Sequence, residues 1–144
     1  MDLAAIHQGL ADLLNEIPDV RAFDSVPDNV PLGRPDLVVV IPDEPYIEYS
    51  IPGAPVKHDM YVTLRIIPQP TSTRSVQQSF FELLSAGTEA PRSVYDKLAG
   101  SAIGRTANQT ACQAYITNVS PRVAQVNGED VLAMDMQVRI LARS

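Results

Sequence analysis

Residues that could carry acid–base, metal or thiol chemistry are few in this chain of 144 residues. The chain has two histidines, His7 and His58, and neither belongs to a His-x-x-x-His or similar metal-binding pair. Its one cysteine, Cys112, has no second cysteine nearby, whereas a reactive thiol needs neighbours that stabilise the thiolate. We therefore expect two surface histidines, a small buried thiol, and no metal or cofactor.

Acidic residues at 43–44 and 129–130 form two adjacent pairs, and paired carboxylates can act as general acid and base. Both pairs fall in expected turns, where acidic residues serve turn geometry and solubility. A metal-dependent hydrolase or nuclease would need Asp36, Asp43 or Asp135 to converge, and no spacing in the sequence predicts this. The chain also lacks a Gly-x-x-x-x-Gly-Lys phosphate loop and a Gly-x-Ser-x-Gly nucleophile elbow. The sequence therefore predicts a protein that is not an enzyme.

Charge and composition argue against several other classes of protein. The 17 acidic and 11 basic residues give a net charge of −6, and the basic residues are scattered, so no DNA-wrapping face is expected. The longest apolar run, residues 37–41, is far shorter than the roughly 18–20 residues of a membrane span. The first residues do not resemble a signal peptide, and a single cysteine fits a reducing compartment. We expect an intracellular protein of one domain.

Three segments have the apolar spacing or the boundary residues of helices. The first should end at Pro18, and its apolar stripe consists of Leu3, Ile6, Leu10, Leu13 and Ile17. The second should be capped by one of residues 71–73 and end near Gly87, with Val76, Phe80, Leu83 and Leu84 on its apolar side. A short third helix is expected at 94–98, followed by a loop at 101–111.

The predicted strands rest on β-branched runs and on alternation. Residues 20–26 can form a short strand, and the continuous run at 37–41 is typical of a strand buried on both faces. Residues 59–66 alternate between apolar and mostly polar positions. Alternating segments on both sides of Asn127-Gly128 predict a final hairpin, because both turn residues tolerate positive φ.

Residues 42–56 contain four prolines, which cannot donate hydrogen bonds to a central ladder, so an edge strand or projecting arm is expected there. Tyr46 and Tyr49 have no obvious core to join in this arm, and tyrosine is frequent at interfaces. Packing of the arm back onto its own sheet is an equal alternative. The candidate interface residues are Tyr46, Ile47, Tyr49 and Ile51, and a second candidate loop at 69–75 contains Arg74.

The order of these elements predicts the fold class. Strands and helices do not alternate one for one, which argues against a doubly wound parallel fold. The sequence instead predicts a single α+β domain over residues 1–144. Its sheet should be mainly antiparallel, with about 4–6 strands and two or three helices packed on one face.

Over nearly its whole length the chain resembles the tail terminator (tail completion) proteins of long-tailed bacteriophages, lambda-type in the broad sense. The resemblance lies in the order of parts and in no single diagnostic motif. Its first half includes Leu13-Leu14-Asn15-Glu16-Ile17 at the end of the first helix, Arg34-Pro35-Asp36-Leu37-Val38-Val39-Val40 and Tyr46-Ile47-Glu48-Tyr49. It continues with Met60-Tyr61-Val62-Thr63-Leu64-Arg65-Ile66-Ile67, Ser93-Val94-Tyr95-Asp96-Lys97-Leu98 and the Asn127-Gly128 hairpin.

The resemblance implies a virion protein of the tail and neck, assembled in the cytoplasm of a host bacterium. Such subunits form a ring, typically a hexamer, on the tail tube, where the ring ends tube polymerisation and offers a surface to the head–tail connector. Implied partners are copies of the chain, the tail tube protein and the connector protein, while DNA only passes through the channel. The family offers no catalytic motif to carry over. Alternatives are another head–tail connector or head-closure protein, a small-ligand binding module, and a hydrolase.

Overall fold

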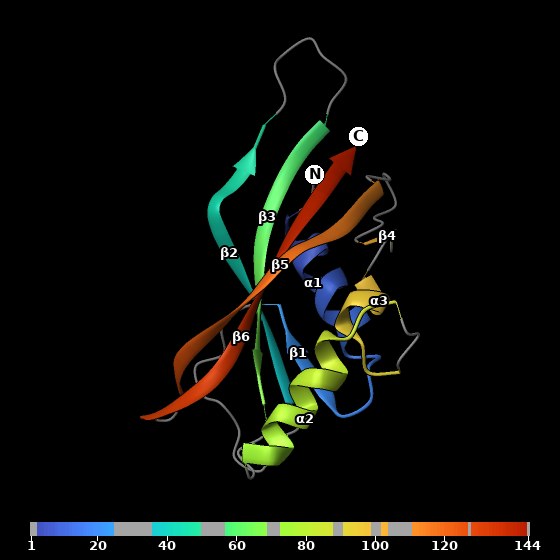
Figure 1. Ribbon diagram of the computed structural model, residues 1–144. Coiled ribbons are helices and arrows are strands. Elements are labelled where there is room, and N and C mark those ends of the chain that lie inside the picture. Colours follow the sequence, from blue (N-terminus) through green and yellow to red (C-terminus); the bar gives the residue numbers. More distant parts are fainter. Residues whose placement is uncertain are drawn as a thin grey trace.

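The computed structural model describes residues 3–24, 36–49, 57–68, 73–87, 91–98, 102–103, 111–126 and 128–143 (Figure 1). These residues form three helices, α1 (Leu3–Leu14), α2 (Thr73–Leu84) and α3 (Val94–Leu98). They also form six strands, β1 (Val20–Phe23), β2 (Asp36–Glu48), β3 (Lys57–Ile67), β4 (Ala102–Ile103), β5 (Ala111–Val126) and β6 (Glu129–Arg143). None of the helices within these ranges is long and apolar enough to cross a membrane.

The six strands form one sheet in the order β1-β2-β3-β6-β5-β4. β1 and β2 are parallel, and the other neighbouring pairs are antiparallel. Connections between antiparallel neighbours can be short, and the β5–β6 hairpin turns at Gly128, whose φ is +82°. The predicted α+β class with a mainly antiparallel sheet is therefore confirmed, and so is the final hairpin.

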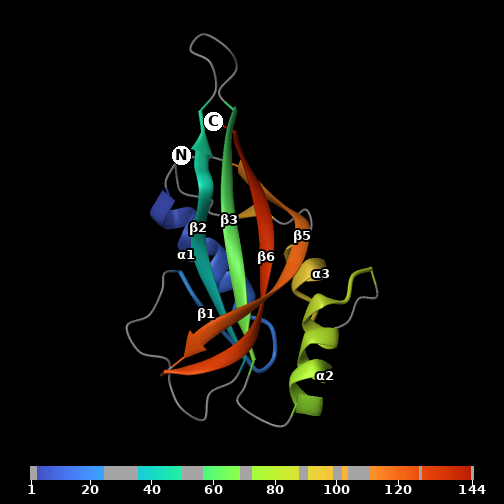
Figure 2. The same cartoon turned by 60° about the vertical axis from the view of Figure 1, so that its left-hand side comes forward.

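The main core lies between one face of the sheet and the three helices (Figures 1 and 2). Side chains alternate between the two faces of a strand, so every second residue of β3 points toward the helices. Met60, Val62, Leu64 and Ile66 are these residues, and all four are 0% exposed. The matching side chains come from α1, α2 and α3, including Leu10, Phe80, Leu83 and Leu98.

A smaller apolar cluster lies on the other face of the sheet. The β5–β6 hairpin twists strongly, and its outer end crosses the other strands in both views (Figures 1 and 2). Ala124 and Ala133 of the hairpin thereby join the apolar side chains of Leu37, Val39 and Ile67. This second cluster explains why residues 37–40 of β2 are buried on both faces, as the continuous apolar run at 37–41 predicts, while Ile41 is only partly buried.

The first helix is shorter than predicted, because α1 ends at Leu14 and not at Pro18. The N–H groups of Glu16 and Ile17 bond to carbonyls three residues back, which tightens the chain into a narrower turn. The side chain of Asn15 then bonds to both the N–H and the carbonyl of Ala22 in β1. Ile17 stays 2% exposed, so the predicted apolar stripe continues although the α-helix does not.

The later elements agree with the prediction except at one point. α2 ends before Gly87, which has φ +73°, and α3 has the predicted bounds. Ala102 and Ile103 form the short strand β4, which pairs with residues 112–113 of β5, so the prediction of a loop was wrong there. The partner strand β5 lies about ten residues further along the chain, so a local pattern over two residues does not indicate this pairing. Residues 104–110 lie outside the described ranges.

Candidate functional site

The β5–β6 hairpin has an exposed apolar surface on the face that elsewhere forms the main core. β5 and β6 pair in register, with Val119 opposite Met136, Pro121 opposite Met134 and Val123 opposite Leu132. Met136 is 1% exposed, whereas Val123 is 66% and Leu132 is 44% exposed. We call this surface the apolar strip, and it consists of Val119, Pro121, Val123, Leu132 and Met134.

The strip is exposed because the hairpin is longer than the layer of helices. Along β6, the residues that share a face with the strip are Ile140, Val138, Met136, Met134 and Leu132. The first three are buried, Met134 is partly buried against the main core, and Leu132 is exposed. The sequence continues the apolar pattern of a core strand beyond the point where the protein's own helices cover it. An exposed apolar surface of this kind is a candidate site for binding another molecule.

A second exposed apolar surface lies on α2, around Phe81. Phe81 is 71% exposed, while its neighbour Phe80 is 3% exposed and belongs to the main core. Successive residues of a helix point about 100° apart, so the two rings cannot face the same way. The exposed residues beside Phe81 are Gln77 and Gln78, which are uncharged. The sequence signal for this surface is the Phe80-Phe81 pair, because two adjacent phenylalanines in one helix cannot both face the core.

The predicted interface residues on the arm have different environments. Tyr46 and Ile47 pack partly buried against the main core, so this part of the arm returns to its own domain. The Tyr46 hydroxyl lies 2.6 Å from Nε2 of His7, and burial raises the pKa of Tyr46 above its ordinary value. Tyr49 is 71% exposed, and its ring meets His58 edge to face at 5.3 Å.

The two other predicted interface positions are Ile51 and Arg74. Ile51 lies outside the described residues, and Arg74 lies in the first turn of α2.

Among the described residues, β1 pairs only with residues 36–39 of β2, so residues 42–48 lie at the sheet edge. The pairing with β3 shifts register between Pro42 and Ile47, where the prolines fall.

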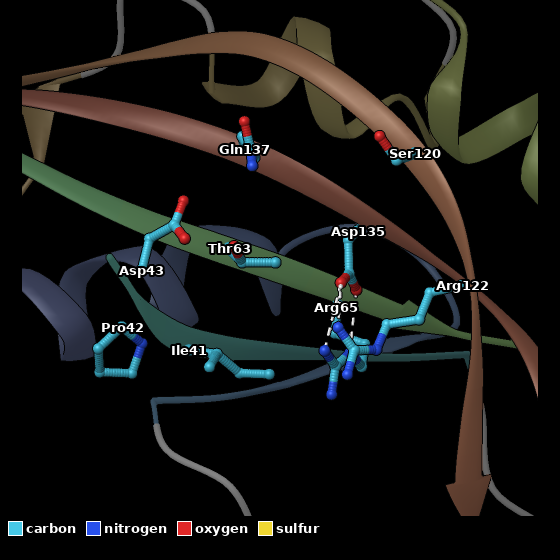
Figure 3. A pocket seen from close by; sticks show the side chains of 9 residues that line it. All are labelled: Ile41, Pro42, Asp43, Thr63, Arg65, Ser120, Arg122, Asp135 and Gln137. Carbon is cyan, nitrogen blue, oxygen red and sulfur yellow. Dashed lines mark hydrogen bonds and ion pairs between the residues drawn. The ribbon is translucent and has the colours of Figure 1, made fainter. Parts of the chain in front are cut away.

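A polar pocket of about 310 Å³ lies on the sheet face that the helices do not cover (Figure 3). Asp135 accepts hydrogen bonds from Nε and Nη2 of Arg65 at 2.9 and 3.2 Å, and Arg122 is 3.6 Å from the same carboxylate. Asp43 lies on the β2 side of the pocket and accepts a hydrogen bond from the Glu44 N–H. The other lining residues are Ile41, Pro42, Thr63, Ser120 and Gln137.

The pocket brings together two of the three carboxylates that a metal-dependent hydrolase would need. Asp43 and Asp135 line it, but Asp36 faces the helices, where it is 2% exposed and bound to Arg92 at 2.6 Å. Within the described ranges, no three His, Cys, Asp or Glu side chains are grouped so that they could hold a metal ion. What the pocket presents is a set of hydrogen-bonding groups of both charges, suited to holding a small polar group.

Arg92 forms hydrogen bonds to three separate parts of the chain. Its guanidinium bonds to Asp36 and Glu82 and to the carbonyl oxygen of Pro18. Burial would lower the pKa of Arg92, but the hydrogen bonds and charges of both carboxylates outweigh burial, and the pKa lies above its ordinary value. Arg92 therefore ties the start of β2 to α2 and to the α1–β1 connection.

The function is inferred from the geometry, because sequence comparison identifies neither a family nor a curated relative. No model of a known protein family matches the sequence, and no curated protein matches it. The described residues offer three surfaces: the apolar strip, the exposed side of α2 and the polar pocket. Of these, the apolar strip departs most from what an isolated domain needs, because it leaves core-type residues in water.

Proposed function

We propose that this chain is a structural subunit that assembles into a ring, caps a phage tail tube and ends its polymerisation. The apolar strip, with Val123 and Leu132 exposed on a core-type face, is the observation that carries the proposal. Covering apolar surface is favourable by about 25 cal/mol per Å², so the strip favours association with another protein. The resemblance of the element order to tail terminator proteins supplies the particular assembly.

The sheet edges supply further support for assembly. Among the described residues, β5 pairs with β4 only at residues 112 and 113, so most of its outer edge faces away from the sheet. The edge of β2 at residues 42–48 lies on the other side of the sheet. Two different exposed edges suit head-to-tail contacts between identical subunits, and contacts of that kind build rings when the rotation closes.

The test is to purify the full chain and add it to tail tube protein encoded in the same genome while the tubes are growing. We expect shorter tubes, with a ring at one end in negative-stain images. Solution mass measured on the chain alone shows whether the ring forms before it meets the tube. Tubes of unchanged length with bare ends would overturn the proposal. Binding to heads but not to tubes would favour a head-closure protein instead.

The polar pocket supports a second function, the binding of a small ligand. Its volume of about 310 Å³ is near the lower end for ligand sites, and Arg122 and Asp43 offer it opposite charges. A thermal-shift screen of small carboxylates, amines and zwitterions would test this function. We expect any true ligand to lose its stabilising effect in Arg122→Gln. Absence of a shift with all compounds would count against the ligand-binding module.

A further inference from the structure

We infer that neighbouring copies of the chain join through two different surfaces, the apolar strip of one copy and the exposed side of α2 around Phe81 of the next. The inference rests on the proposed ring function and names the surfaces that would build the ring. Both surfaces lie within the described residues, on elements whose inner sides are anchored in the main core.

The two surfaces match in character. The strip offers five neighbouring apolar residues, and two of these, Val123 and Leu132, lie directly opposite each other across the hairpin. On α2, Phe81 is the large apolar residue with the most exposed side chain, at 71%. An aromatic side chain that inserts between β-branched and aliphatic residues is a common anchor of protein interfaces.

Charge favours a second copy as the partner at these surfaces. The chain has a net charge of −6, so two copies repel each other at long range, and acidic side chains inside their contact would add to that repulsion. The strip contains no charged residue, and Asp130 lies beyond its outer end. On α2, Gln77, Gln78 and Phe81 are uncharged, while the neighbouring Glu82 is bound to Arg92 at 2.6 Å. A contact between the strip and the exposed side of α2 therefore brings two copies together without placing acidic side chains against each other.

The positions of the two surfaces predict the symmetry of the contact. The outer end of the β5–β6 hairpin and α2 lie at the same end of the molecule but extend to opposite sides of it in both views (Figures 1 and 2). Each copy can therefore use its hairpin toward one neighbour and its α2 toward the other. Such a contact is heterologous, and repeated copies close into a ring or continue as a filament, whereas a two-fold contact would stop at a dimer.

The experiment uses cysteines placed on the two surfaces and a short bismaleimide cross-linker. Cys112, the one native thiol, is first replaced by alanine. The cysteines are placed beside the contact residues, at exposed Gln125, which follows Val123 on the same face of β5, and at exposed Gln78, one turn before Phe81 in α2. One variant carries both Gln125→Cys and Gln78→Cys, and two others carry one of these changes each. We expect the double variant to give a ladder of cross-linked oligomers whose last band is the closed ring. We expect the single variants to remain uncross-linked, because in a heterologous contact position 125 meets position 78 and not itself.

The matched control is Ser120→Cys combined with Gln78→Cys. Ser120 is an exposed residue of β5 three positions before Val123, but it lines the polar pocket on the opposite face of the sheet. This pair should give no ladder. Thermal melting of each variant confirms that the chain is folded before cross-linking.

The outcomes separate this inference from the ring proposal. Dimers of Gln125→Cys alone would show a two-fold contact and overturn the inference, and so would the absence of a ladder when cross-linking is done on capped tubes. Rings that cap tubes but persist in Phe81→Ser and Val123→Ser would overturn the contact while leaving the proposed function intact. A ladder from a chain that never caps tubes would support the contact and count against the proposed function.

Discussion

Nε2 of His7 in α1 lies 2.6 Å from the hydroxyl oxygen of Tyr46 in β2, and the two rings meet edge to face with their centroids 5.9 Å apart. Nδ1 of His7 lies 2.9 Å from the carbonyl oxygen of Asp24, which can only accept a hydrogen bond. Because that carbonyl needs a donor, Nδ1 of His7 carries a proton, and in the neutral tautomer Nε2 accepts the hydroxyl hydrogen of Tyr46. The contact joins the first helix to the proline-rich arm.

Replacing Tyr46 by phenylalanine should lower the free energy of unfolding by about 1 kcal/mol, because His7 loses its hydrogen-bond donor while the ring packing remains. Urea unfolding at neutral pH measures the change. The matched control is Tyr49→Phe, which removes a hydroxyl from a ring that is 71% exposed and should have a smaller effect. Equal effects of the two substitutions would contradict the assigned contact.

The stability of the domain should fall at alkaline pH, in part because of Tyr46. Burial raises the pKa of Tyr46 in the folded protein, so the folded state holds the phenol proton more tightly than the unfolded state does. This contribution is complete below the ordinary tyrosine pKa of about 10 and is lost as the pH rises through the folded pKa. Unfolding measured from neutral to strongly alkaline pH should show a shallower decline in Tyr46→Phe. Identical pH profiles would argue against the shift.

Removal of the Arg92 side chain should destabilise the domain strongly. Asp36 is 2% exposed, and Arg92→Ala takes the guanidinium away from this buried carboxylate, at a cost of about 3 kcal/mol. Arg139→Gln is the matched control, since its ion pair with Asp59 lies at the surface and should contribute much less. Denaturant midpoints of the two variants give the comparison. A small effect of Arg92→Ala would mean that Arg92 does not fasten β2 to α2.

Two substitutions on one face of β6 test where the layer of helices ends. Met136→Ala should cost about 2–5 kcal/mol, because its side chain is 1% exposed and its removal leaves a cavity. Leu132→Ala should change the stability of the isolated chain by less than about 1 kcal/mol, because Leu132 is 44% exposed. Thermal or urea unfolding of the monomer is the measurement. A large cost at Leu132 would show that the hairpin is covered within its own chain.

Local sequence patterns were enough to predict most helices and strands, because each pattern reflects a rule that acts within a few residues. Alternation in residues 59–66 follows from the pleat of a strand, and the positive φ of Gly128 follows from the hairpin turn. The end of α1 was not predictable in this way. Asn15 ends the regular helix by bonding to Ala22, a partner that only the return of the chain as β1 brings within reach.

The sequence by itself determined which face of each strand is apolar, the hairpin, and the small supply of reactive side chains. It did not determine which apolar residues would be covered, because burial depends on where helices from other parts of the chain lie. Leu132 and Met136 follow the same pattern in β6, yet only the tertiary structure places one beyond the helices and the other beneath them. Packing across distant elements decided where the exposed surface lies.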